Sequence, residues 1–246
     1  MLGLARPLGR PALFAALCLA VAACSSSGGG EAGDAGAAGS NLFANPGFED
    51  GARPWFSLDS EAWGRPFTVS AKQAHTGASS GLLELRSEEG GPARVYGIVQ
   101  EVSPDGFPEL LSGAYYVERW QQGTAKQYLQ FVVIVWGANN PPAEVAGVDN
   151  YQIRYVLAGV DAPPLAISNA RYVMAGRGPP VQGEWVPFER NVRQDFEQLW
   201  GAVPVGFDSL RVFFEVRWDE RGASDGPAAA DVYYDDLYLG PPPEAD

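Results

Sequence analysis

Apolar and polar residues alternate in short segments that follow one another through most of the chain. A period of two is the pattern of a β-strand with one buried and one exposed face. Most of these segments are rich in Val, Tyr, Phe and Trp and are bounded by Gly, Pro, Asn or Ser, which favour turns. The pattern predicts strands at residues 67–71, 80–86, 94–102, 114–121, 127–136, 151–157, 170–174, 185–192, 210–218 and 231–239.

Helical periodicity is persuasive only at residues 194–200, where Gly201 and Pro204 end the segment. Many strands and at most one short helix predict an all-β fold, an antiparallel β-sandwich of two sheets. No repeat and no second low-complexity break interrupts residues 41–240, so we expect one domain there, followed by a Pro-rich tail at 241–246.

The first residues have the pattern of a secretory signal. Arg6 and Arg10 form a basic start, and the apolar run that follows is too short to span a membrane. The run ends in Val21-Ala22-Ala23-Cys24, which resembles a bacterial lipobox, in which the cysteine becomes the first mature residue and carries lipid. The alternative is an ordinary secretory signal with a chance cysteine.

The lipobox interpretation divides the N-terminal part of the chain. It makes residues 1–23 a lipoprotein signal peptide and residues 24–40 a lipidated Cys24 with a Gly/Ser/Ala-rich flexible tether. Because Ser25 rather than Asp follows the cysteine, we expect a lipid-anchored protein of the bacterial cell envelope, at the outer membrane or cell surface.

Charge and rare residues limit the chemistry. The net charge of −13 disfavours nucleic acid and anionic lipid as partners and leaves neutral ligands and cations. With His75 the only histidine and no cysteine after Cys24, a Ser-His-Asp or Cys-His nucleophile is nearly excluded. Glu118 and Glu215 could serve glycoside hydrolysis if they faced each other across a cleft, but acid pairs are mostly chance in an acid-rich chain, so we expect no enzyme.

Four motifs occur in an order that is informative. Asn-x-x-x-Asn-Pro-Gly-Phe-Glu-x-Gly at 41–51 precedes Trp55, His-Thr-Gly-Ala-Ser-Ser-Gly-Leu stands at 75–82, Gly-Glu-Trp at 183–185, and Val-Tyr-Tyr-Asp-Asp-Leu-Tyr-Leu at 232–239. Together they resemble carbohydrate-binding modules of the family 4/9 type. The resemblance implies a galactose-binding-like jelly roll that binds carbohydrate without cleaving it. Residues 137–182 depart from the family pattern, being longer and richer in Pro and Gly, and their role stays open.

The resemblance also implies a structural calcium ion. Its ligands would be Glu49, Asp235 and backbone carbonyls of the turn around His75 and Gly77. Calcium takes about six to eight oxygens and accepts carbonyls beside carboxylates. Strand alternation places Asp235 with Leu237 and Leu239, so Asp235 is expected to be the buried acid of the Asp235-Asp236 pair. The alternative is that these acids are solvated or paired with arginine.

Several strands carry aromatic, charged and amide side chains on the face opposite an apolar one. Flat rings stack on the C–H faces of sugars, and polar side chains bind hydroxyls. The concave sheet face is the glycan cleft in the resembling modules. We therefore expect one ligand-binding face, with Tyr116 and Trp120 as stacking residues, made of Tyr116, Glu118, Trp120, Tyr128, Gln130, Arg154, Arg211, Glu215 and Arg217. The alternative is an ordinary exposed face with Arg–Glu cross-strand pairs.

The function expected from the sequence is that of a surface-anchored lipoprotein whose sandwich domain binds an uncharged or weakly charged carbohydrate non-catalytically. Its contact with the membrane would be through the lipid only. The main alternative is a structural or protein-interaction lipoprotein with the same fold and no sugar site. A glycan-cleaving enzyme is the lesser alternative.

Overall fold

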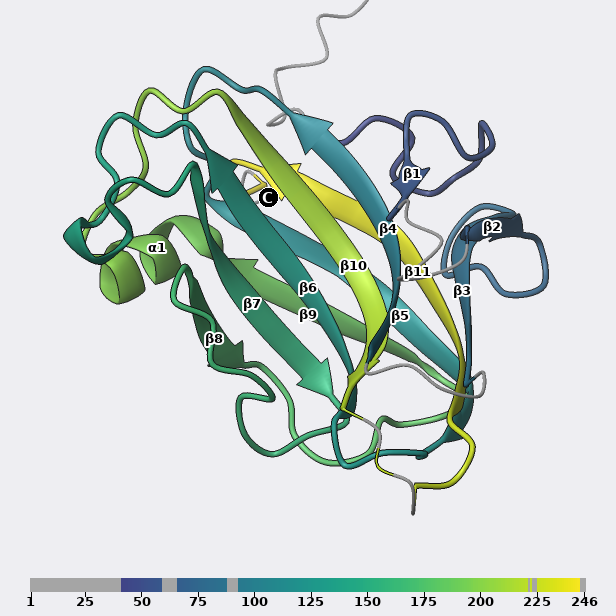
Figure 1. The fold of residues 1–246 in the computed structure, drawn as a ribbon. Helices are drawn as coiled ribbons and strands as arrows, with labels where there is room; N and C mark the ends of the chain where they lie inside the picture. The colour runs from purple at the N-terminus through teal and green to yellow at the C-terminus, as the bar shows by residue number, and fades with distance from the viewer. Residues whose placement is uncertain (1–40, 59–65, 88–92, 221, 223–224, 244–246) are drawn as a thin grey trace, which may run out of the picture. The chain divides into compact units, whose positions relative to one another are not determined.

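The computed structural model describes residues 41–58, 66–87, 93–220, 222 and 225–243 (Figure 1). The predicted signal peptide, Cys24 and the tether lie outside the described residues. No helix in the described part of the chain is long and apolar enough to cross a membrane.

Two sheets make up the domain. The six-stranded sheet has the order β1-β4-β10-β6-β7-β8. Its strands are β1 Phe56–Ser57, β4 Ala93–Val102, β10 Ser209–Asp219, β6 Gln127–Trp136, β7 Asn150–Ala158 and β8 Ala170–Met174. The five-stranded sheet has the order β2-β3-β11-β5-β9. Its strands are β2 Thr68–Ser70, β3 Ser80–Arg86, β11 Ala229–Gly240, β5 Leu110–Gln121 and β9 Trp185–Asn191.

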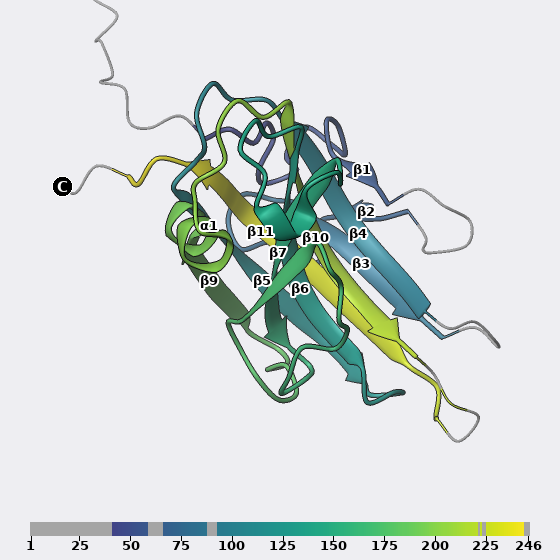
Figure 2. The same cartoon turned by 60° about the vertical axis from the view of Figure 1, so that its left-hand side comes forward.

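The sheets stack face to face, with the six-stranded sheet in front in Figure 1 and the layers seen from another side in Figure 2. Between β3 and β4, β5 and β6, and again between β10 and β11, the chain passes from one sheet to the other, as in a jelly roll. The predicted all-β sandwich is confirmed. One pairing differs from the expectation, because β8 runs parallel to β7.

The predicted strands and the helix are all present, with ends that differ by a few residues at most. The sequence missed β1 and the 3-10 helix Ala143–Val145, which are too short to show a period. Helix α1, Val192–Trp200, buries Val192, Phe196 and Trp200 and ends at Gly201, whose φ of 83° is the left-handed conformation that glycine adopts without strain.

The core lies between the sheets and follows the alternation of β10. Leu210, Val212, Phe214, Val216 and Trp218 all point inward and are buried. Removing each such side chain from water contributes about 1.5–3 kcal/mol of transfer free energy. The other side of every strand in this sheet therefore forms an outer face that is available to a ligand.

The segment with the Asn-Pro-Gly motif joins the two ends of the domain. The Asn45 side chain donates to the carbonyl of Gly51 over 2.7 Å, and the Trp55 indole donates to the carbonyl of Asn45 over 2.8 Å. The backbone N–H of Leu42 donates to the carbonyl of Leu239 over 2.7 Å. The opening motif thus lies beside β11, and its acids come close to those of the closing strand.

Candidate functional site

The nine predicted ligand residues do not form one face. Six of them lie on the outer face of the six-stranded sheet, namely Tyr128, Gln130, Arg154, Arg211, Glu215 and Arg217. Tyr116, Glu118 and Trp120 belong to β5 of the other sheet. The single face predicted from the sequence is therefore wrong. Alternation shows which residues share one side of a strand, but it does not show which strands share a sheet.

A β-bulge displaces Trp120 from the face of Tyr116. Val117 pairs with Val232, but Arg119 pairs with Asp231, so Glu118 is an extra residue in β5. Beyond the bulge Trp120 pairs with Ala230 and packs against the core. Trp120 therefore does not share a stacking surface with Tyr116, contrary to the sequence prediction.

The outer face of the six-stranded sheet is hollowed by a groove of about 170 Å³. Apolar and charged side chains line it together: Leu58, Val95, Val132, Ile134, Arg154, Phe213, Glu215 and Arg217. The apolar part includes a small cluster of Val99, Val132 and Phe213 that is separate from the main core. Leu58 lies over Gly97, and a Cβ at Gly97 would stand 2.7 Å from Leu58 Cδ1, so a larger residue there would displace the Leu58 side chain.

A buried polar network forms the base of the groove. Glu215 is 4% exposed and Arg217 is 6% exposed. The Gln130 amide donates to Glu215 Oε2 over 2.5 Å, and Arg217 Nη1 lies 3.6 Å from the same oxygen. Arg217 also bonds to Asp219, which accepts a second hydrogen bond, of 2.5 Å, from the Tyr128 hydroxyl. Each carboxylate is thus both paired and hydrogen-bonded, as buried charges require.

The ionisation of this network follows from its geometry. Burial by itself would lower the pKa of the Arg217 guanidinium, but the nearby charges of Glu215 and Asp219 outweigh burial and raise it. Burial is also the main reason why the pKa of Tyr128 is raised. Arg217 therefore stays charged and Tyr128 stays neutral as a hydrogen-bond donor.

Five polar atoms on this face are buried without a partner among the described residues. One is Trp136 Nε1, near Arg211, and the other four are Gln130 Oε1, Arg154 Nη1, Tyr172 OH and Arg217 Nε. Arg154 and Tyr172 are cross-strand neighbours on β7 and β8, and Gln130 pairs with Glu215. The only hydrogen bond of the Arg154 guanidinium among the described residues goes to Gln152, over 2.9 Å. Since the large majority of buried side-chain polar atoms are hydrogen-bonded, five such atoms on one face require an added partner, either water or a ligand.

Arg211 forms an Arg–Glu cross-strand pair, as the alternative interpretation of this face predicts. It stands directly opposite Glu101 on β4 and donates to it from Nε over 2.8 Å, at the exposed end of the face. Its guanidinium also lies 5.4 Å from the centre of the Trp136 ring. Arg211 is therefore a partner in a surface ion pair rather than part of the groove.

Glu118 and Glu215 cannot act as a pair. Glu118 bonds to Lys72 over 2.5 Å and accepts from the Tyr233 hydroxyl over 2.9 Å on the outer face of the five-stranded sheet. Glu215 lies on the outer face of the opposite sheet. The whole sandwich separates the two carboxylates, so they do not face each other across a cleft.

The acids expected to hold calcium instead hold the turn beside β11. Glu49 Oε1 accepts from the backbone N–H groups of Ala78 and Ser79, both over 2.9 Å. Asp235 Oδ2 accepts from the N–H of His75 over 2.7 Å, and Asp235 Oδ1 from the N–H of Asp236, also over 2.7 Å. Gly77 leaves room for this contact, because a Cβ there would stand 2.4 Å from Glu49 Oε1.

This donor set does not fit calcium. The N–H groups point at the carboxylate oxygens that the ion would use, whereas calcium needs carbonyl or other oxygen atoms around it. Among the described residues there is also no group of three or more His, Cys, Asp and Glu side chains that could hold a metal. Calcium therefore stays a prediction from the resemblance, without support from this geometry.

Asp235 is buried, as expected, but for another reason. A register shift after Asp235 places Leu237 and Leu239 in the core, while Asp235 faces the turn at 75–76 on the outer side. Burial raises the pKa of the Asp235 carboxyl, and the hydrogen bonds from backbone N–H groups partly offset this.

Sequence reasoning missed the apolar lining of the groove, namely Val95, Val132, Ile134 and Phe213, and it also missed Asp219, Tyr172, Leu58 and Gly97. Asp219 continues the alternation of β10 one residue beyond the predicted end of that strand, and Tyr172 alternates within β8, so both carried a usable signal. Leu58 and Gly97 have no such signal in the sequence, because their role depends on how one chain segment lies over another. Of the groove-lining residues only Arg154 comes from the long segment 137–182, whose strands β7 and β8 extend the sheet.

No protein-family model matches the chain, and no curated protein matches it in sequence. Among solved structures, it resembles TmCBM61 in complex with β-1,4-galactotriose, with 16% identity, a TM-score of 0.42, and coverage of 81% of this chain and 97% of that chain. It also resembles a non-crystalline cellulose specific carbohydrate-binding module, CBM28, with 14% identity, a TM-score of 0.39, and coverage of 80% and 93%.

A third similar structure is the enzymatically active domain of tailspike protein 4 of bacteriophage CBA120. The identity is 10% and the TM-score 0.43, and the match covers 81% of this chain but only 21% of that one. All three TM-scores are below 0.5, so these likenesses carry no argument about ligand or activity.

Proposed function

We propose that the protein binds a neutral carbohydrate, without cleaving it, in the groove on the outer face of the six-stranded sheet. The observation that supports this is the set of unpaired buried atoms of Gln130, Arg154, Tyr172 and Arg217 on one face. Three of these groups donate hydrogen bonds and one accepts. A sugar hydroxyl does both, so one ring can satisfy donors and acceptor together.

Charge and shape favour a neutral sugar. Arg154 and Arg217 balance Glu215 and Asp219, so the groove has no net charge to attract an ion. The apolar wall of Val132, Ile134 and Phe213 offers a surface to the C–H face of a pyranose. The groove is shallow and lies on a rigid sheet, as suits binding of part of a longer chain.

A glycan array that carries neutral and charged oligosaccharides tests this proposal. We expect binding to neutral glycans, and incubation with the same glycans should release no new reducing ends. An array without any bound glycan would contradict carbohydrate binding and would favour a structural or protein-interaction role. Release of reducing ends would contradict the non-catalytic part.

We also propose that the protein is anchored to the cell surface by lipid on Cys24. The lipobox and the Gly/Ser/Ala-rich segment after it support this, and both lie outside the described residues. Cys24→Ala should abolish metabolic labelling with a fatty-acid analogue and release the protein from membranes. Cys18→Ala is the matched control and should leave labelling unchanged. A Cys24→Ala variant that still takes up the label would contradict the anchor.

A further inference from the structure

A second, larger cleft lies on the other side of the sandwich, on the outer face of the five-stranded sheet. Its volume is about 540 Å³, which is within the range of small-molecule sites. β5 and β9 form its floor, and the turn before β3 forms one side. The residues that matter here are His75, Ser112, Pro187, Phe188, Glu189 and Asp236.

A row of aromatic residues borders this cleft. Tyr233, Tyr116 and Trp185 are successive cross-strand neighbours on β11, β5 and β9, with ring centres 6.0 and 5.6 Å apart. The His75 ring lies 5.3 Å from that of Trp185. None of these rings belongs to the core between the sheets. Tyr233 is buried, so the half-buried rings of Tyr116 and Trp185 are the ones that present an apolar surface beside Pro187.

The polar groups of the cleft carry negative charge. Its lining includes the carboxylates of Asp236 and Glu189 but no Lys or Arg. Asp236 already has two partners, the His75 imidazole at 2.5 Å and the Thr76 hydroxyl, which donates to it over 2.5 Å. Glu189 is exposed and has no ion pair or hydrogen bond among the described residues. Glu189 stands directly opposite Ser112 on β5. The only ammonium group near this face, that of Lys72, is already bonded to Glu118.

These features define the ligand that fits. Glu189 lacks a partner and would be satisfied by a positively charged donor, to which the nearby charge of Asp236 adds attraction. The Ser112 hydroxyl can bond to a hydroxyl group, and Pro187 offers an apolar surface. Pro187 also lacks the N–H that a strand added at the edge strand β9 would need, so a peptide could not extend the sheet there without losing a hydrogen bond. Recognition therefore depends on side chains, as in sugar binding.

We propose that this cleft binds a protonated amino sugar. Its ammonium group would lie between Glu189 and Asp236, and the ring would rest on Pro187 beside Trp185. This site shares no lining residue with the groove of the six-stranded sheet. The inference is thus independent of the neutral carbohydrate proposed for that groove.

Calorimetry of the protein with a β-1,4-linked glucosamine tetramer tests the proposal, with the N-acetylated tetramer as the uncharged counterpart. Both titrations are done at a pH where the free amine is protonated and at about 0.15 M salt, which screens distant charges. We expect the glucosamine tetramer to bind and the N-acetylated tetramer to bind more weakly. Glu189→Gln should weaken binding of the glucosamine tetramer about fivefold, the upper effect of an exposed ion pair.

Two variants serve as matched controls. Glu197→Gln removes the same charge from an exposed position on α1 and should leave the affinity unchanged. Arg154→Met alters the other groove and should also leave binding of the glucosamine tetramer unchanged. Equal effects of Glu189→Gln and Glu197→Gln would overturn the proposal, as would equal binding of the two tetramers to the Arg154→Met protein, in which the other groove is altered. A tetralysine peptide that binds as tightly as the glucosamine tetramer would show general attraction to an acidic protein and would overturn it as well.

Discussion

The two outer faces of the sandwich have the same alternation of residues, but they differ in whether their charged side chains are buried and paired. On the six-stranded sheet, Glu215 and Arg217 are buried, and Arg217 forms ion pairs with Glu215 and Asp219. The positive and negative charges therefore balance within the groove. On the five-stranded sheet, Glu189 is exposed and unpaired among the described residues, and the cleft beside it is acidic. The same residue types thus produce a neutral, preorganised groove on one face and an acidic, open cleft on the other.

The difference arises from the residues across the strands. Each buried acid of the groove has an arginine or an amide in reach on its own strand or the next. Glu189 faces Ser112 instead, and water solvates its charge. Buried charges are costly unless they are paired, whereas exposed ones cost little, so substitutions on the two faces should have unequal effects.

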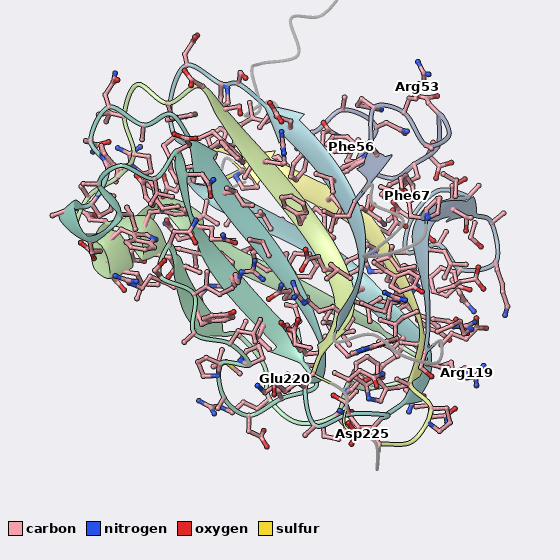
Figure 3. The ribbon with its side chains drawn as sticks, in the orientation of Figure 1. Arg53, Phe56, Phe67, Arg119, Glu220 and Asp225 are labelled. Atoms are coloured by element: carbon pink, nitrogen blue, oxygen red, sulfur yellow. The ribbon has the colours of Figure 1, made fainter. Side chains whose placement is uncertain are left out.

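The largest expected effect comes from breaking the buried network. Arg217→Met leaves Glu215 and Asp219 buried without their cation, so the free energy of unfolding should fall by about 3–5 kcal/mol. Arg119→Met is the control, because Arg119 projects outward from the end of β5 (Figure 3) and should change stability by less than about 1 kcal/mol. Urea unfolding measures both. If both variants lost the same free energy of unfolding, the proposed difference between buried and exposed charges on the two faces would be contradicted.

Glu49 tests what organises the five-stranded face near β11. Glu49→Ala removes the acceptor for the N–H groups of Ala78 and Ser79 and should lower the free energy of unfolding by about 1 kcal/mol, whereas Asp50→Ala, at an equally exposed position without such contacts, should not. Because hydrogen bonds already satisfy these carboxylates, a chelator should leave the melting temperature of the unaltered protein unchanged. A melting temperature that rises with added calcium would instead support the shared cation implied by the resemblance.

Arg154 separates binding from stability on the groove face. Its guanidinium is not part of the ion pairs of Glu215 and Asp219, so Arg154→Met should change the melting temperature little. Loss of a charged donor should nevertheless weaken binding of the strongest neutral glycan from the array about tenfold, or about 1.4 kcal/mol. Calorimetry measures the affinity of Arg154→Met for this glycan, with Arg119→Met as the control variant. Unchanged affinity would remove Arg154 from the site.

The smallest expected effect is at Tyr116, which the sequence alone made a stacking residue. Because Tyr116 lies on the five-stranded sheet, Tyr116→Ala should leave binding of the same neutral glycan unchanged. Phe213 lines the groove, so Phe213→Ala is the comparison variant and should weaken binding of this glycan. If Tyr116→Ala weakened binding and Phe213→Ala did not, the neutral glycan would bind on the five-stranded sheet, and the proposed groove would be wrong.

Strand positions could be predicted from the sequence because a period of two is a local property. The strand at residues 127–136, for example, has the predicted limits. The grouping of strands into sheets could not be predicted, because it depends on pairings such as β10 with both β4 and β6. That is why Tyr116 and Glu215 were assigned to one face.

Register shifts account for the other errors. The bulge at Glu118 has no Gly or Pro to mark it, and it reverses the side on which Trp120 lies. The shift after Asp235 has a weak signal in the adjacent Asp236, whose φ of 51° is a conformation that Asp tolerates better than most residues. The buried network is predictable only in part. Alternation identifies Tyr128, Gln130, Glu215 and Arg217, whereas Asp219 lies one residue beyond the predicted end of its strand.

The most direct test of the neutral groove is an NMR titration of the arginine Nε–H signals with the strongest neutral oligosaccharide from the glycan array. The account predicts that the Nε–H signal of Arg217 shifts and saturates because that group gains a partner, and that the Nε–H signal of Arg154 shifts with it because a partner binds the adjacent Nη1, while the signal of Arg119 stays in place. Unmoved Arg217 and Arg154 signals at saturating oligosaccharide, with shifts confined to the face of Tyr116 and Trp185, would contradict it.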